Sequence, residues 1–223
     1  MNELKAVIFD MDGVLIDSES IHYEIERIIF DRLGISVPEE VHSTYMGTAG
    51  DFMYADLKSR FALTDSVEEL LEADDLFRGE YFSNLAHIAP NDGVIGLLDE
   101  IRATGLKLGV ATSSPPEVVK ILLTRCGIIS YFDAIVTTTE AGPSKPAPDV
   151  YLLAAEKLNV SPSECVVFED SPNGLLAAKR AGMFCIVMQP NLALDPLLAK
   201  ADFRIESFTG FTLTRLRDIA AIQ

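Results

Sequence analysis

Two aspartates follow the first apolar run of the sequence, two positions apart. Residues 6–9 are apolar, Asp10 and Asp12 come next, and Gly13 then allows the backbone to turn sharply. A short apolar run of this type is typical of a buried strand, and two carboxylates at its end are costly to desolvate. The pair therefore indicates an acidic site that faces a cation or an electrophile.

Polar residues of complementary chemistry stand after later apolar runs. Thr112-Ser113-Ser114 follows the second run, Lys145 comes after the third, and Glu169-Asp170 follows the fourth. Taken singly, each of these residues suits a turn or a helix cap. Taken together, acids, hydroxyl groups and an isolated lysine at strand ends fit phosphoryl transfer.

The charges of these residues predict a metal ion. Four carboxylates in one cleft repel each other, by roughly 4 kcal/mol for two charges ~4 Å apart at an effective dielectric of 20. A phosphate could not enter without compensation, and Mg²⁺ with oxygen ligands is the usual cation at phosphate sites. Lys145 would add positive charge, and a helix starting after Ser114 would direct backbone N–H groups at phosphate oxygens.

Strand-like runs alternate with helical stretches along most of the chain. The runs cover residues 6–9, 106–111, 134–136, 165–168 and 184–188. This alternation predicts an α/β, Rossmann-like, doubly wound parallel sheet with helices on both faces, which binds ligands at the carboxyl ends of its strands. Ser113 or Ser114, followed by Pro115, is expected to cap one of the helices.

One segment interrupts the alternation. Residues 17–86 show helical periodicity without a convincing strand, and Pro90-Asn91-Asp92-Gly93 predicts a turn where the chain re-enters the sheet. We therefore expect a core domain made of residues 1–16 and 87–223, with an all-helical domain of residues 17–86 inserted after the first strand.

The four polar segments resemble the four motifs of the haloacid dehalogenase superfamily. Residues 10–18 resemble motif I, Thr112-Ser113-Ser114 motif II, residues 145–149 motif III and residues 167–174 motif IV. The motifs occur in the family's order over nearly the whole chain, and the insert is similar to the C1 cap of the family. The overall pattern is similar to the β-phosphoglucomutase-like and sugar-phosphatase branch.

The resemblance implies roles for the two aspartates. Asp10 would be the nucleophile that forms an aspartyl-phosphate. Asp12 would be the general acid that protonates the leaving oxygen and the general base that then activates water.

The resemblance also implies the groups that bind phosphate and Mg²⁺. Thr112, Ser113 and Lys145 would hold the phosphate oxygens. Asp170 would bind Mg²⁺, with Glu169 as a direct or an indirect partner. The Asp10 carboxylate and the Asp12 backbone carbonyl would complete the protein ligands.

Substrate specificity is expected from the cap. The segment from Tyr45 to Asp51 resembles a substrate loop that would place Gly47 near the ligand, but Gly50 stands where the mutases carry an arginine. His22 and Arg78 could add contacts to the substrate. A solvated helix face is the favoured interpretation for Arg78, and both interpretations stay open for His22.

The composition limits the classes of binding partner and the cellular location that we expect. A net charge of −16 disfavours nucleic acid and anionic membranes as partners. The three cysteines form no CxxC pair, which suits reduced thiols in a cytoplasmic protein. Neither a signal peptide nor a membrane span is expected. A monomer is the expected state, because a cap of this size shields its own cleft.

Three functions follow, in order of preference. The first is a Mg²⁺-dependent phosphatase that hydrolyses a small phosphorylated metabolite, most suitably a sugar phosphate, through an aspartyl-phosphate. The second is a mutase of the β-phosphoglucomutase type, which would share every core residue. The third, from a different class, is a non-catalytic phosphate-binding module.

Overall fold

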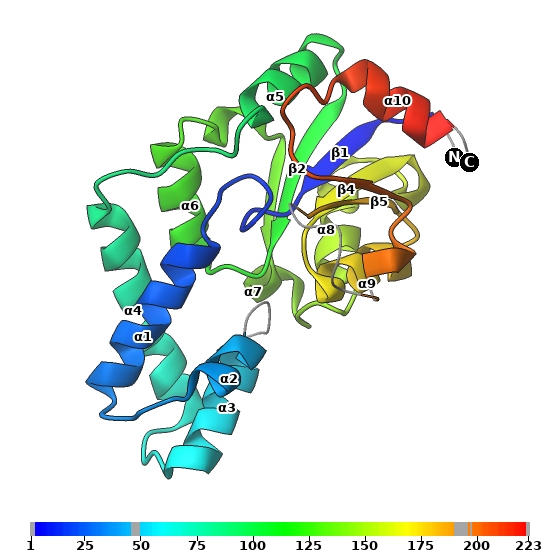
Figure 1. The fold of residues 1–223 in the computed structure, drawn as a ribbon. Coiled ribbons are helices and arrows are strands. Elements are labelled where there is room, and N and C mark those ends of the chain that lie inside the picture. The colour runs from blue at the N-terminus through cyan, green and yellow to red at the C-terminus, as the bar shows by residue number, and fades with distance from the viewer. Residues whose placement is uncertain (1–2, 46–49, 190–195, 197, 222–223) are drawn as a thin grey trace. The chain divides into compact units, whose positions relative to one another are not determined.

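The computed structural model describes residues 3–45, 50–189, 196 and 198–221 of the protein. The chain divides into two compact units, each described here by itself. The core unit consists of Met1–Asp17 and Ile88–Gln223, and the inserted unit consists of Ser18–His87. Figure 1 traces both along the chain.

A parallel sheet forms the centre of the core unit. In the described part of the chain it has six strands in the order β3-β2-β1-β4-β5-β6. Their bounds are β1 Ala6–Phe9, β2 Lys107–Thr112, β3 Ala134–Thr137, β4 Cys165–Glu169, β5 Phe184–Met188 and β6 Phe203–Ile205. The predicted parallel α/β sheet is confirmed. The sixth strand was not predicted, because three residues that include Arg204 give no apolar run.

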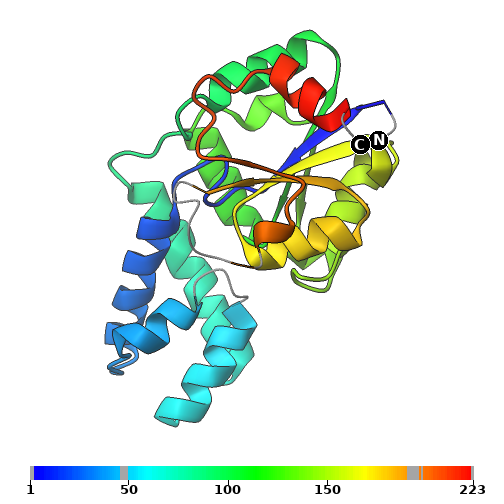
Figure 2. The ribbon, with the colours of Figure 1, turned by 45° about the vertical axis from the view of Figure 1, so that its right-hand side comes forward.

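Helices cover both faces of this sheet, as Figures 1 and 2 show. On one face α8 (Asp149–Leu158) packs on β1, β2 and β3, and α9 (Pro172–Arg180) packs on β4 and β5. On the other face lie α5 (Val94–Ala103), which contacts β2, and α10 (Leu213–Ala221), which contacts α5. The unit also contains α6 (Pro116–Arg125) and α7 (Thr138–Ala141), and short 3₁₀ turns at Ile129–Tyr131, Pro162–Glu164 and Leu198–Lys200.

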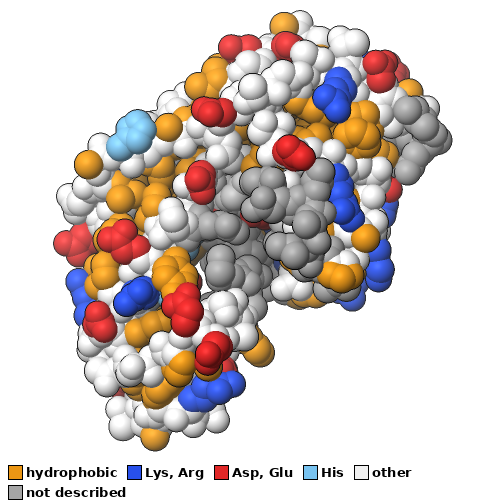
Figure 3. Space-filling model, viewed as in Figure 1, with side chains coloured by type: hydrophobic (Ala, Val, Ile, Leu, Met, Phe, Trp, Pro, Cys, Tyr) orange, Lys and Arg blue, Asp and Glu red, His pale blue; other side chains and the backbone are white. Residues whose placement is uncertain are grey.

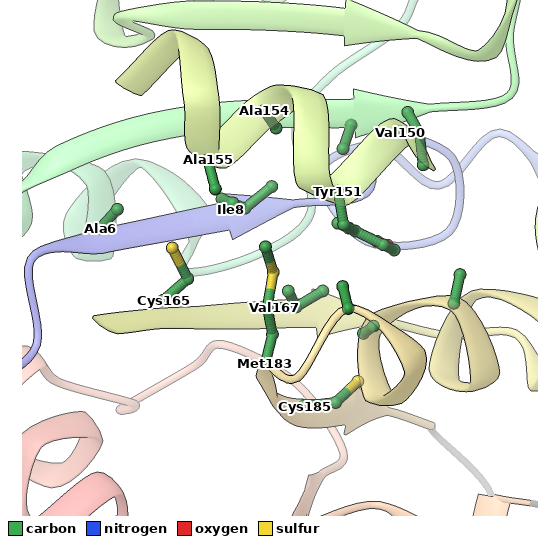
Figure 4. Packing of buried hydrophobic residues seen from close by; sticks show 14 of the residues in the cluster. Ala6, Ile8, Val150, Tyr151, Ala154, Ala155, Cys165, Val167, Met183 and Cys185 are labelled. Atoms are coloured by element: carbon green, nitrogen blue, oxygen red, sulfur yellow. The ribbon is translucent and has the colours of Figure 1, made fainter. Parts of the chain in front are cut away.

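Alternate residues of β1 fill the two layers between sheet and helices. Ala6 and Ile8 belong to the apolar cluster beneath α8 and α9 (Figure 4). Successive side chains of a strand point to opposite faces, so Phe9 lies on the other side. There it stacks on Phe168, with ring centroids 5.0 Å apart. Burying Ile8 on one face and Phe9 on the other contributes about 1.5–3 kcal/mol each, which holds the central strand from both sides.

The register of the central strands sets where the polar residues emerge. Phe9 pairs with Val110 of β2 and with Phe168 of β4. The next residues along the three strands are therefore Asp10, which directly follows β1, and Ala111 and Glu169, which lie at or near the carboxyl ends of β2 and β4.

The described residues of the inserted unit form helices and connecting turns. The helices are α1 (Glu19–Arg32), α2 (Glu39–His42), α3 (Gly50–Phe61) and α4 (Val67–Asn84), with a 3₁₀ turn at Ser43–Tyr45. α4 contacts both α1 and α3. It begins with a capping box, in which Ser66 accepts a hydrogen bond from Glu69 N and Glu69 accepts one from Ser66 N.

The surface carries charges of both signs. On the face in Figure 3, acidic and basic side chains are interspersed with apolar ones. Among the residues described, no helix combines the length and apolar character that a membrane crossing requires. Cys126, Cys165 and Cys185 are free thiols.

Candidate active site

Lys145 lies between two carboxylates at the carboxyl edge of the sheet. Its Nζ donates to Asp10 Oδ1 at 2.6 Å, to Glu169 Oε1 at 2.7 Å and to the backbone oxygen of Ala111 at 3.1 Å. Burial alone would lower the pKa of Lys145, but the charges of Asp10 and Glu169 outweigh burial and raise the pKa. The lysine is therefore a cation that holds the two strand ends together.

Asp10 is poorly solvated. Burial raises the pKa of Asp10 to about 7; the Lys145 ammonium opposes the rise, and the charges of Glu169 and Asp12 add to it. Near neutral pH the carboxyl group is thus only partly ionised. A divalent cation beside it would favour the ionised form, because opposite charge stabilises a carboxylate.

Glu169 is fully buried and surrounded by donors. Its Oε1 accepts from Lys145 and from the Tyr151 hydroxyl, each at 2.7 Å. Its Oε2 accepts from the backbone N–H groups of Asp170 (2.9 Å) and Ser171 (3.0 Å) and from Ser171 Oγ (3.1 Å). Burial alone would raise the pKa of Glu169, but Lys145 and these hydrogen bonds hold it below its usual value.

The start of α9 is built around this carboxylate. Ser171 caps the helix by accepting from Gly174 N at 3.0 Å, and Pro172 occupies its first position. A Cβ on Gly174 would lie 1.7 Å from Glu169 Oε1, so the first helical turn can approach the carboxylate only with glycine there. The helix N-terminus also stabilises the negative charge.

Three carboxylates are close enough to hold one cation. Asp10, Glu169 and Asp170 each offer an oxygen within 4.8 Å of the others. Asp170 follows β4 and packs against Gly13, whose φ is +73°. An all-oxygen set of carboxylates is the donor chemistry that Mg²⁺ prefers, so these residues fit the predicted metal.

Asp12 is held by the loop that follows β2. Ser114 Oγ donates to Asp12 Oδ2 at 2.6 Å, and Ser114 N donates to Thr112 Oγ1 at 3.1 Å. Thr112 is buried, whereas Ser113 is exposed. The prediction that Ser113 or Ser114 caps the following helix is wrong. Pro115 is the N-cap of α6, because Ser114 turns its hydroxyl towards Asp12 instead.

Asn91 fixes the turn that carries Asp12 and Gly13. Its Nδ2 donates to the backbone oxygens of Gly13 at 3.2 Å and Val14 at 2.7 Å, and its backbone N donates to Leu15 O at 2.9 Å. The turn-rich sequence around Asn91 was identified as a re-entry point, but nothing in it indicated these partners.

Sequence reasoning missed four residues that contact the site. The position of Ser114 in the segment Thr112-Ser113-Ser114 could have indicated a contact with the site. Tyr151 and Gly174 lie on helix faces that packing alone would explain, and the role of Asn91 depends on partners more than 70 positions away. The four residues are Asn91, Ser114, Tyr151 and Gly174.

Arg78 lies inside the inserted unit, only 8% exposed. Its Nε donates to Asp74 Oδ1 at 2.6 Å, its Nη1 lies 2.8 Å from His22 Nδ1, and its Nη2 lies 3.5 Å from Glu26 Oε1. The interpretation of Arg78 as part of a solvated helix face is therefore wrong. Burial alone would lower its pKa, but Asp74 and Glu26 raise it, so the guanidinium stays charged.

His22 is half-buried beside Arg78. A guanidinium donates only, so His22 Nδ1 accepts from Arg78 and the imidazole proton sits on Nε2. The His22 ring also meets Phe82 edge-on, with centroids 5.2 Å apart. Gly47 lies outside the described residues. The substrate roles of His22, Gly47 and Arg78 stay predictions.

Comparison with known proteins shows the family to which the chain belongs. The family model of haloacid dehalogenase-like hydrolases matches residues 7–188. The chain is 36% identical to the phosphorylated carbohydrates phosphatase of Thermotoga maritima, over 81% of this chain and 82% of that protein. It is 30% identical to the β-phosphoglucomutase of Bacillus subtilis, over 86% of this chain and 88% of the mutase.

A solved structure shows the same likeness in three dimensions. The crystal structure of CbbY from Rhodobacter sphaeroides in complex with phosphate superposes with a TM-score of 0.83 at 28% identity, covering 96% of this chain and 99% of CbbY. The chain belongs to the haloacid dehalogenase-like hydrolase family, in the branch of the β-phosphoglucomutases and sugar phosphatases.

Proposed function

We propose that the protein is a Mg²⁺-dependent phosphatase that hydrolyses a small phosphorylated metabolite, most suitably a sugar phosphate, through an aspartyl-phosphate. The observation that carries this proposal is the position of Lys145 Nζ, 2.6 Å from Asp10 Oδ1, with Asp12 held separately by Ser114. One aspartate is thus next to a cation that attracts phosphate, and the other is bound to a neutral hydroxyl.

In the first step, Asp10 Oδ attacks phosphorus and the bond to the ester oxygen breaks. Asp12 gives its proton to the departing oxygen, so the product leaves as an alcohol. In the second step, Asp12 takes a proton from water while the water oxygen attacks phosphorus. The acyl-phosphate bond then breaks, which releases phosphate and restores Asp10.

Three further side chains would bind the transferring group. Lys145 would hold a phosphate oxygen with its charge. Thr112 Oγ1 accepts from Ser114 N, an arrangement that leaves the hydroxyl proton to donate to phosphate. The exposed Ser113 is the third predicted phosphate contact.

Mg²⁺ would be held by Asp10, Asp170 and the Asp12 backbone carbonyl, with Glu169 beside them. When bound, it supplies positive charge that offsets the carboxylates and the phosphate. Support comes from the cluster of carboxylate oxygens within 4.8 Å.

Turnover of a panel of phosphate monoesters, with and without EDTA, tests this proposal. Wild-type protein should release phosphate only when Mg²⁺ is available, and Asp10→Asn should abolish release. Asp99→Asn is the control, because Asp99 is an exposed carboxylate whose partner is Tyr131. Full activity of Asp10→Asn would exclude the aspartyl-phosphate mechanism.

A mutase is the second candidate, favoured by the identity to the Bacillus subtilis enzyme. A bisphosphate needs a cation for its second phosphate, and the buried Arg78 already faces the carboxylates of Asp74 and Glu26. We therefore rank hydrolysis first. Incubation with β-glucose 1-phosphate and a bisphosphate activator discriminates the two, since a mutase forms glucose 6-phosphate faster than free phosphate.

We further propose that the inserted unit is the substrate cap and that the protein is a cytoplasmic monomer. Light scattering of the purified protein tests the monomer, and cell fractionation tests the location.

A further inference from the structure

Tyr151 is the fully buried tyrosine of α8, and it extends from that helix towards the sheet (Figure 4). Its hydroxyl donates to Glu169 Oε1 at 2.7 Å. Its ring centroid lies 4.9 Å from Lys145 Nζ. One side chain thus contacts both members of the Lys145–Glu169 pair, through a hydrogen bond to one and a cation–π contact to the other.

The two oxygens of Glu169 are held by different kinds of donor. Oε2 is bound by the N-terminus of α9 and by Ser171 Oγ. Oε1 accepts from side chains, Lys145 and Tyr151, at the same distance of 2.7 Å. Lys145 has further acceptors, Asp10 and Ala111 O, that compete for its protons. The Tyr151 hydroxyl therefore fixes Oε1 whichever way Lys145 turns.

This geometry matters because Lys145 must exchange partners. It would bind phosphate in the proposed reaction while remaining beside Asp10. A lysine side chain is flexible, and precise placement of its ammonium group needs a fixed acceptor and a fixed surface. Glu169 Oε1 is the acceptor, and the Tyr151 ring is the surface.

We infer that Tyr151 is a positioning residue, which fixes Glu169 and, through it, places Lys145 Nζ for binding the transferring phosphate. The inference rests on the proposed phosphate-binding role of Lys145. Tyr151 itself would not touch substrate. A purely structural role predicts something different: phenylalanine fills the same space, so the kinetic constants would stay unchanged even if the lost hydrogen bond lowered the stability.

Tyr151→Phe removes the hydroxyl and keeps the ring. Tyr131→Phe is a matched control in the same unit, since Tyr131 also donates to a carboxylate, Asp99, at 2.6 Å, but at the surface. We expect Tyr151→Phe to lower kcat/KM on the order of tenfold and to weaken competitive inhibition by inorganic phosphate by a similar factor, as loss of a hydrogen bond to a charged group predicts. Tyr131→Phe should leave both constants unchanged.

Thermal melting of both variants separates positioning from folding, because a structural role would lower the melting temperature and leave the kinetic constants unchanged. If Tyr151→Phe keeps kcat/KM and the phosphate inhibition constant within about twofold of wild type, the inference is wrong.

A second measurement does not depend on turnover. Crystal structures of wild type and Tyr151→Phe should differ by more than about 0.5 Å in the position of Glu169 Oε1 or Lys145 Nζ. If the wild type hydrolyses no ester, the proposed function fails, and the crystal structures then decide the inference: coincident positions overturn it.

Discussion

Asp170 packs directly against the α-carbon of Gly13: a Cβ built on Gly13 would lie 1.8 Å from Asp170 Oδ2 and 2.7 Å from its Cγ. Gly13 also has a positive φ of +73°. The turn after β1 and the carboxylate after β4 therefore exclude any side chain between them.

Gly13→Ala should displace Asp170 and so weaken Mg²⁺ binding. We expect the Mg²⁺ concentration for half-maximal activity to rise by about tenfold or more, as found when groups that orient metal ligands are lost. Gly105→Ala is the control, because Gly105 has a similar φ of +77° but nothing within 4 Å of its Cβ position. Equal Mg²⁺ requirements in the two variants would contradict the packing argument.

Lys145→Met should destabilise the protein as well as slow its release of phosphate. Removing the lysine leaves Asp10 and Glu169 buried without their shared cation, which typically costs about 3–5 kcal/mol. Urea denaturation in EDTA measures this free energy of unfolding without compensation from Mg²⁺. Lys157→Met removes an exposed lysine whose Nζ lies 2.6 Å from Glu140, and such surface pairs contribute about 0–1 kcal/mol. If both variants lost a similar free energy of unfolding, the ion pairs of Lys145 would contribute no more to stability than an exposed pair.

Arg78→Met tests the buried ion network of the inserted unit. Asp74 would lose its 2.6 Å partner and Glu26 its nearest guanidinium nitrogen. A loss of about 3 kcal/mol in the free energy of unfolding is expected, since one partner of a buried pair is removed. The control, Arg60→Met, breaks an exposed i,i+4 pair with Asp56, which is worth about 0.3–0.5 kcal/mol. A stable Arg78→Met protein would refute the network's structural importance.

Mg²⁺ affinity should depend on pH through Asp10. Burial raises the pKa of Asp10 to about 7, so the metal-free carboxyl gains a proton as pH falls through that value. In the proposed site Mg²⁺ would bind the ionised form and displace the proton. The apparent Mg²⁺ affinity should therefore fall by up to about tenfold per pH unit below about pH 7 and level off above it, as linkage requires for one proton. Calorimetric titration from about pH 5.5 to about pH 8.5 measures this. A flat profile would show that Asp10 is already ionised without metal.

The sequence was sufficient to predict the position of those site residues that follow or end a strand. Asp10, Thr112 and Glu169 end apolar runs, and a parallel sheet brings such ends to one edge regardless of loop detail. It was insufficient where a side chain's partners come from another element. Helical periodicity marks Arg78 as polar but cannot show that Asp74, Glu26 and His22 surround it inside the unit.

Tyr151 is a second residue whose contacts could not be predicted from the sequence. Its position in a buried helical stripe is explained by packing, and only the fold shows that its hydroxyl reaches Glu169, 18 residues later. Polar contacts made by residues in apolar stripes leave no periodic pattern in the sequence, so only the folded structure shows them.

The pairing of Leu15 with Asn91, and of Ile16 with Pro90, brings the departing and the returning chain together within the core unit. The helical insertion therefore leaves and rejoins its host at a single seam. Because the two ends of the inserted segment lie next to each other, the segment does not require the strands of the sheet to change position. During evolution such a segment could be lengthened, trimmed or exchanged without displacing the strand ends that carry Asp10 and Glu169.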